Sequence, residues 1–124
     1  MNLSKLNPTK SVPAAVALTN PYTDEVIKDG KGKPVEITVH GMQSSVARNK
    51  YAELNKKGVN MGDEGVGAEI LAAITVSWTD NLVTDLGTLE CTFENAKALY
   101  TAEDWIAGQV LAFASDMANF APKT

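Results

Sequence analysis

Residues 35–58, VEITVHGMQSSVARNKYAELNKKG, hold a strand and a capped helix in one short stretch and decide the fold class. Val35, Ile37 and Val39 alternate with polar residues. This period of two is typical of a half-buried strand, because successive side chains point to opposite faces. Gly41 ends the alternation, so the sequence predicts a strand over residues 35–40.

The second half of this stretch predicts a helix over residues 44–57. Ser44 or Ser45 provides an N-cap. Apolar residues then recur along one helical face at Ala47, Tyr51 and Leu54. Two lysines at the end complement the helix dipole, and Gly58 is a suitable C-cap.

Upstream, the pattern indicates two further short strands. Residues 14–19 alternate weakly and end at an Asn-Pro pair, and residues 24–27, DEVI, form a second strand candidate. Residues 28–34, KDGKGKP, read as a turn whose glycines supply positive φ angles. The N-terminal half is therefore predicted to form a small antiparallel β-hairpin or meander.

Downstream, the pattern predicts helices. Residues 68–78 repeat apolar side chains every fourth position, and Asp63 is a candidate cap for this helix. Residues 93–100 form a shorter helix, for which Thr92 is a suitable N-cap.

The final predicted helix covers residues 102–119 and begins with a capping-box-like pattern from Thr101 to Asp104. Its apolar residues form a single stripe at spacings of four, three, four and three: Ile106, Val110, Phe113, Met117 and Phe120. Trp105 lies beside this stripe.

These elements predict an α+β fold, a small antiparallel hairpin or meander followed by three to four helices. The chain of 124 residues fits one domain. We expect a flexible N-terminal arm over residues 1–13, where Pro8 and Pro13 interrupt regular structure. A single domain over residues 14–120 and a short tail over residues 121–124 complete the chain.

Composition excludes several classes of function. The formal net charge is −4 and the isoelectric point is about 4.9, so the surface lacks the cations that bind nucleic acid or anionic lipid. No apolar run approaches the roughly 20 residues of a membrane span. Cys91 is the only cysteine, which excludes an internal disulfide. We expect a soluble protein of the cytoplasm without nucleic-acid or membrane partners.

Candidate catalytic and metal-binding groups each have a simpler structural explanation. Gly62, Gly65 and Gly67 lack the spacing of a phosphate-binding loop, so a flexible loop is favoured. The acidic residues of segment 80–90 lack the alternating ladder of a calcium loop. His40 is the only histidine, and a single ligand does not make a metal site. We therefore expect no catalytic residue, cofactor or metal, and no enzymatic activity.

The apolar side chains of the C-terminal half remain as candidates for protein binding. They are Trp78, Trp105, Ile106, Phe113, Met117 and Phe120. An amphipathic helix usually buries such a face, so an intramolecular core is the alternative reading. Tryptophan is enriched at binding hot spots, which keeps the partner-binding reading open.

Four segments in order give the chain a resemblance to the tail assembly chaperones of long-tailed bacteriophages. They are AAVALTNPYTDEVI at residues 14–27, KDGKGKPVEITVHGMQSS at 28–45, ILAAITVSW at 70–78, and CTFENAKALYTAEDWIAGQVLAFASDMANF at 91–120. Two positions depart from the family's pattern. Asp24 replaces a usual glycine after the Pro-x-Thr turn, and Ala47 replaces the aromatic residue often found before Arg48.

The resemblance implies a protein that binds the tape measure protein and keeps it soluble in the host cytoplasm while tail tube subunits polymerise around it. Such a chaperone leaves before the virion matures and associates with further copies of itself. The resemblance also implies that this chain is the shorter product of a programmed frameshift, the longer one diverging after roughly Phe120. Two alternatives remain open: a structural tail completion or tube protein retained in the virion, and a regulatory or anti-defence protein that acts on a host partner.

Overall fold

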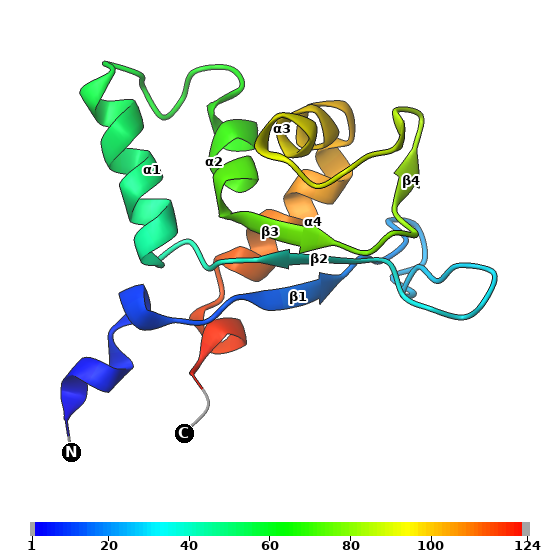
Figure 1. Ribbon diagram of the computed structural model, residues 1–124, viewed down its shortest axis with the longest axis horizontal. Coiled ribbons are helices and arrows are strands. Elements are labelled where there is room, and N and C mark those ends of the chain that lie inside the picture. Colours follow the sequence, from blue (N-terminus) through cyan, green and yellow to red (C-terminus); the bar gives the residue numbers. More distant parts are fainter. Residues whose placement is uncertain (1, 123–124) are drawn as a thin grey trace.

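The structure, a computed structural model, describes residues 2–122 and has the predicted α+β architecture (Figure 1). The helices are α1 Ser45–Lys56, α2 Val66–Ile74, α3 Phe93–Ala102 and α4 Asp104–Ala114. The strands are β1 Ala14–Ala17, β2 Glu36–Val39, β3 Thr75–Trp78, β4 Val83–Thr84 and β5 Gly87–Thr88. Three short 3-10 turns add Leu3–Leu6, Pro8–Lys10 and Met117–Phe120.

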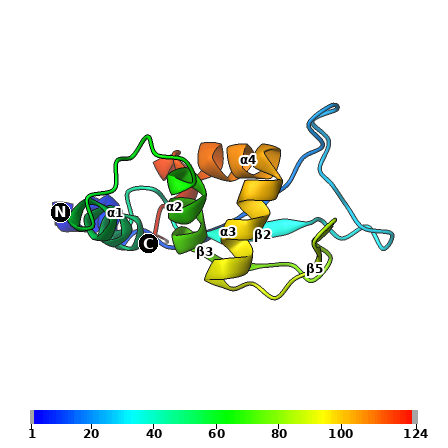
Figure 2. The ribbon, with the colours of Figure 1, turned by 90° about the horizontal axis from the view of Figure 1, so that it is seen from above.

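The central layer is an antiparallel sheet in the order β1-β2-β3. Val16 of β1 pairs with Ile37 of β2, which pairs in turn with Trp78 of β3. Ile37 and Val39 are fully buried, whereas the residues that alternate with them are only partly covered. In Figure 1, α2 and α3 stand above β3 and α4 passes behind the strands, and Figure 2 places α4 along one side of β2. The prediction of a half-buried strand over residues 35–40 is confirmed.

Two predicted helix caps are confirmed. The Ser44 and Thr92 hydroxyls accept the backbone N–H of the third residue of α1 and α3, respectively. The cap predicted at Asp63 is wrong, because α2 begins after Gly65, whose φ of 83° favours glycine.

The predicted helix over residues 68–78 is too long. It ends at Ile74, and the chain continues directly into β3. The Thr75 hydroxyl donates to the carbonyl of Leu71 at 2.7 Å and closes the helix there. Pairing with β2 then decides the conformation of Thr75–Trp78, a segment whose β-branched residues suit a strand.

The predicted helix over residues 102–119 is also too long at both ends. Glu103 leaves helical geometry and separates α3 from α4, and its side chain caps nothing, so the predicted capping box is absent. α4 ends at Ala114, and Asp116 then caps the separate 3-10 turn Met117–Phe120. The stripe predicted to lie on one helix is therefore divided between two elements.

Two predictions for the N-terminal half need correction. Segment 24–27, predicted as a strand, makes only an isolated bridge between Thr19 and Val26, because the positive φ of 61° at Asp24 turns the chain directly before it. The arm predicted without regular structure contains two 3-10 turns, capped by the Asn2 and Asn7 side chains. Met1 lies outside the described residues, and the flexibility of the arm stays a prediction.

Tyr100 on α3 joins the helical layer to the sheet. Its O–H donates to the Thr75 hydroxyl oxygen at 2.6 Å, at the point where α2 becomes β3. The side chain is only 2% exposed, and this burial raises the pKa of Tyr100 to about 12. A single buried hydrogen bond thus connects α2, α3 and the sheet edge.

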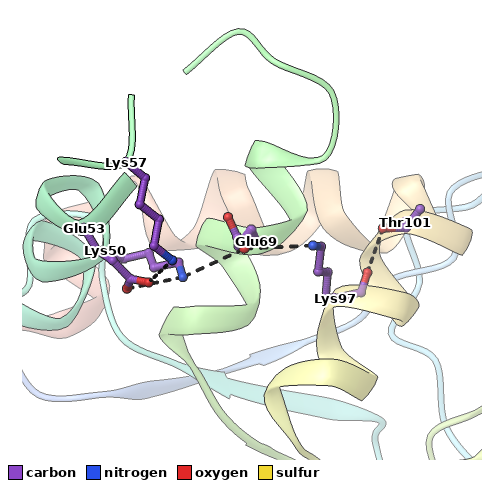
Figure 3. Close-up of polar contacts among 6 residues, drawn as sticks. All are labelled: Lys50, Glu53, Lys57, Glu69, Lys97 and Thr101. Atoms are coloured by element: carbon purple, nitrogen blue, oxygen red, sulfur yellow. Dashed lines mark hydrogen bonds and ion pairs between the residues drawn. The ribbon is translucent and has the colours of Figure 1, made fainter. Parts of the chain in front are cut away.

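A cluster of charges joins the outer surfaces of three helices (Figure 3). Glu69 on α2 lies 4.0 Å from Lys50 of α1 and 3.9 Å from Lys97 of α3. Lys50 and Lys57 also pair with Glu53 at 3.4 and 3.0 Å within α1. The cluster is partly solvated and links helices, so we interpret it as structural.

Candidate protein-binding groove

Two apolar hollows border Trp105, one of the predicted site residues. One hollow, of about 520 Å³, lies between the 18–35 hairpin, segment 81–85 and the start of α4. A second hollow, of about 510 Å³, is lined by Asn20, Pro21, Tyr22, Ile27 and Trp105. Ile27 and Trp105 border both hollows, and we call the two hollows together the Trp105 groove. Its size is in the range that accepts side chains of a partner.

The Trp105 side chain is held in place by a contact within its own chain. It lies in the first turn of α4, and its indole N–H donates to the Glu103 carboxylate at 2.9 Å. The ring is only partly buried, so part of its apolar surface faces the groove. Buried aliphatic side chains line the groove beneath it: Leu18, Val35, Leu82 and Ile106. The indole N–H thus already has a hydrogen-bond partner within its own chain, and part of the apolar ring is exposed. A side chain with these two properties is a preorganised anchor for a partner.

Gln109, one turn further along α4, holds the two main walls together. Its amide N–H donates to the carbonyl of Thr19 at 2.7 Å, and its amide oxygen accepts the Thr19 N–H at 2.9 Å. Thr19 leads into the turn that carries Tyr22, and Ile27 follows that turn. The pair of hydrogen bonds therefore sets the separation between the hairpin wall and the Trp105 wall.

Asn81 fixes the opposite wall. Its amide donates to the carbonyls of Lys33 and Pro34 at 3.2 and 3.3 Å and to the Asp29 carboxylate at 3.1 Å. The backbone N–H of Lys33, the Asn81 amide and the backbone N–H of Lys31 lower the pKa of Asp29, in that order of size. Asp29 is therefore ionised at neutral pH and adds negative charge to the groove.

The surface around the groove is both apolar and acidic. The Tyr22 side chain is 94% exposed at one rim and Val83 is 65% exposed at another. Segments 20–34, 79–85 and 103–105 together hold seven carboxylates against three lysines. This end of the molecule thus accounts for the whole formal net charge of −4. Such a surface attracts cationic partners and repels anionic ones.

The structure places only two of the six predicted binding residues in this groove. Trp105 and Ile106 lie there, the former half-buried and the latter buried. Trp78 lies at the end of β3, packs against the core and donates its indole N–H to the carbonyl of Leu89 at 2.9 Å. Its ring therefore contributes to packing.

The other three predicted residues gather at the far end of α4. The Phe113 and Phe120 rings meet edge to face at 5.4 Å, and Phe120 is only 1% exposed. Met117 is 54% exposed and borders a smaller hollow of about 280 Å³ beside the N-terminal arm. The intramolecular-core reading thus fits Phe120, while Trp105 and Met117 lie at separate surfaces.

Sequence reasoning missed three residues that shape the groove. Tyr22 follows an Asn-Pro pair in a turn, and an aromatic residue in a turn is a signal of exposure. Gln109 is a polar residue four positions after Trp105 in an otherwise apolar run. Ile27 belongs to the segment predicted as a strand. Their meeting depends on contacts between distant parts of the chain.

The described residues offer little chemistry beyond binding. Residues 2–122 contain no group of three His, Cys, Asp or Glu side chains that could hold a metal ion. Burial raises the pKa of the Cys91 thiol, which makes it a poor nucleophile at neutral pH, and burial lowers the pKa of His40. Within the same part of the chain, no helix is long and apolar enough to cross a bilayer.

Comparison with protein-family models, with curated proteins and with solved structures found no match to this chain. The functional interpretation therefore depends on the groove and on the order of segments in the sequence.

Proposed function

We propose that this chain is a non-catalytic, protein-binding domain that works as a phage tail assembly chaperone. The Trp105 groove holds an apolar helical segment of the tape measure protein and keeps that client soluble while the tail tube assembles. One observation carries the proposal: a partly buried indole, fixed by its own hydrogen bond, lines a preformed hollow beside a fully exposed tyrosine.

The groove suits a client that must be released. Its apolar surface is divided between a buried floor and a few anchors, so each contact contributes modest affinity. Many copies bound along one long client gain avidity without tight individual sites.

The identity of the client rests on the order of the four family-like segments in the sequence. The same resemblance supports work in the host cytoplasm beside tail tube subunits, and release before the virion matures. The rival function is a tail component that stays in the particle. Mass spectrometry of purified virions separates the two, since a chaperone is absent from them and a completion or tube protein is present in stoichiometric amounts.

The binding role is tested by co-expression with the tape measure protein of the phage that encodes this chain. Trp105→Ala and Tyr22→Ala should each leave the domain folded and lower the soluble yield of the client, with affinity at least about tenfold weaker for Trp105→Ala.

Leu111→Ala and Val76→Ala are matched controls, because both residues are about half exposed and neither lines the groove. Circular dichroism checks that all four variants fold. Unchanged client solubility with folded Trp105→Ala, or equal losses in the controls, would refute a role for the groove.

A further inference from the structure

The N-terminal arm, residues 2–13, has a composition opposite to that of the Trp105 groove. It carries Lys5 and Lys10, and the first acidic residue of the chain is Asp24. Leu3 and Leu6 are 69% and 68% exposed. The arm therefore combines positive charge with large apolar side chains that its own molecule leaves open.

The arm is also weakly tied to its own domain. Every described hydrogen bond of residues 2–11 stays within the arm, and the first backbone link to the body is the Val12 N–H to the carbonyl of Phe120 at 3.2 Å. Leu6 and Pro8 border the hollow beside Phe120, which remains unfilled. The 3-10 turns give the arm a short, preformed shape.

The arm and the groove lie at opposite ends of the molecule. In Figures 1 and 2 the N-terminus is at the left and the hairpin that forms the groove wall is at the right, with the sheet between them. In this structure the arm therefore lies away from the groove of its own chain. A second copy can bring the two surfaces into contact.

We propose that the arm of one copy docks into the Trp105 groove of the next. Leu3 and Leu6 cover the open faces of Trp105 and Ile27, while Lys5 and Lys10 lie among the carboxylates at the rim. Opposite charges steer the encounter, and burial of the apolar anchors supplies the stability.

This contact joins two different surfaces, so each copy retains one free arm or one free groove. Such a head-to-tail interface builds rings when the rotation closes and filaments when it does not. It also covers the apolar groove when no client is present. The inference uses the groove of the proposed function, and client and arm then compete for it. The experiment that tests the arm contact contains no client. A failure of this inference can therefore be distinguished from a failure of the proposed chaperone function.

The test uses two full-length variants that each lose one half of the contact. Leu3→Ser with Leu6→Ser removes the arm anchors and keeps the groove. Glu25→Lys with Asp85→Lys reverses charge at the groove and keeps the arm. All four positions are exposed, so the fold is preserved.

Sedimentation velocity in about 50 mM salt measures the outcome. Wild-type protein should form species larger than a dimer as its concentration rises, with at least about tenfold weaker association for each variant alone. An equimolar mixture should form a one-to-one heterodimer and stop there, because only one arm and one groove remain intact. Leu111→Ser with Val76→Ser, a control away from both surfaces, should assemble like wild type.

Two results would overturn the inference. Wild-type protein that stays monomeric throughout the concentration series lacks the contact altogether. A wild type that assembles while the mixture remains monomeric uses a different interface.

Discussion

Tyr100 on α3 and Trp105 on α4 are aromatic residues of neighbouring helices with opposite roles. The Tyr100 O–H donates to Thr75, a residue of another element, and its ring is enclosed by the core. The Trp105 N–H donates to Glu103, two residues earlier, and its ring is only partly covered. The two residues differ in the position of the group that accepts their hydrogen bond. A hydrogen bond to a distant element ties the fold together, whereas a local one holds a ring in place at the surface.

The residues that surround Tyr100 and Trp105 differ as well. Tyr100 belongs to the main core, a cluster made mostly of aliphatic and alanine side chains from α2, α3, α4 and the sheet. The Trp105 region is bordered by turns, whose walls are held by the Gln109 and Asn81 amides. Side-chain packing determines the structure around Tyr100, whereas a few polar contacts hold the walls around Trp105. Mutations should therefore affect stability in one region and binding in the other.

Replacement of Tyr100 should destabilise the protein more than replacement of Trp105. Tyr100→Ala should lower the free energy of unfolding by about 3–5 kcal/mol, because it leaves a cavity and removes the hydrogen bond to the Thr75 hydroxyl. Trp105→Ala should cost clearly less, about 1–2 kcal/mol, since the Trp105 side chain is only partly buried. Urea unfolding followed by circular dichroism measures both. Equal losses in the two variants would mean that Trp105 contributes to the core as much as Tyr100 does.

The next effect is alkaline destabilisation through Tyr100. Its pKa is raised to about 12 in the folded state from an unfolded value near 10, so the stability it contributes is complete below pH 10 and is lost as the pH rises through 12. The loss should reach about 2–3 kcal/mol. Urea midpoints of the wild type and Tyr100→Phe between pH 9 and 12 measure it. The difference between the two proteins should shrink with rising pH, and parallel curves would contradict the assignment.

Local sequence signals predict the core around Tyr100 better than the groove around Trp105. The strand around Ile37 and the Ser44 and Thr92 caps follow from short-range alternation and capping chemistry. β3 was missed because Ile70, Ile74 and Trp78 continue a helical period past the true end of α2. Only the pairing of β3 with β2, which involves distant residues, decides in favour of a strand.

The groove illustrates the same limit more strongly. Trp105 and Ile106 were predicted as binding residues from residue type and stripe alone. The Gln109 amide meets the Thr19 backbone across a sequence separation of 90 residues. The periodicity of a single helix or turn does not predict a contact between residues so far apart. The tertiary structure is therefore needed to assign Tyr22 and Ile27 to the site.

Gln109 on α4 links the hairpin wall of the groove to the helix that carries Trp105. Gln109→Met keeps the shape of the side chain but removes both hydrogen bonds to Thr19, which should cost about 1–2 kcal/mol of stability. It should also lower client affinity, because the wall that carries Tyr22 is no longer held at a fixed distance. Isothermal titration with a client fragment and urea unfolding separate the two effects. A variant that loses stability but binds normally would show that the clamp is purely structural.

The smallest effect is expected at the charged cluster of Glu69, Lys50 and Lys97, which belongs to neither region. Glu69→Gln removes two contacts of 4.0 and 3.9 Å that join three helices. The pairs are partly solvated, so the loss should stay below about 1 kcal/mol and disappear in about 1 M salt. Urea unfolding at low and high salt measures it, with Glu94→Gln on α3 as a matched exposed carboxylate outside the cluster. A loss that persists at high salt would mean that Glu69 stabilises the helices through packing of its aliphatic stem rather than through charge.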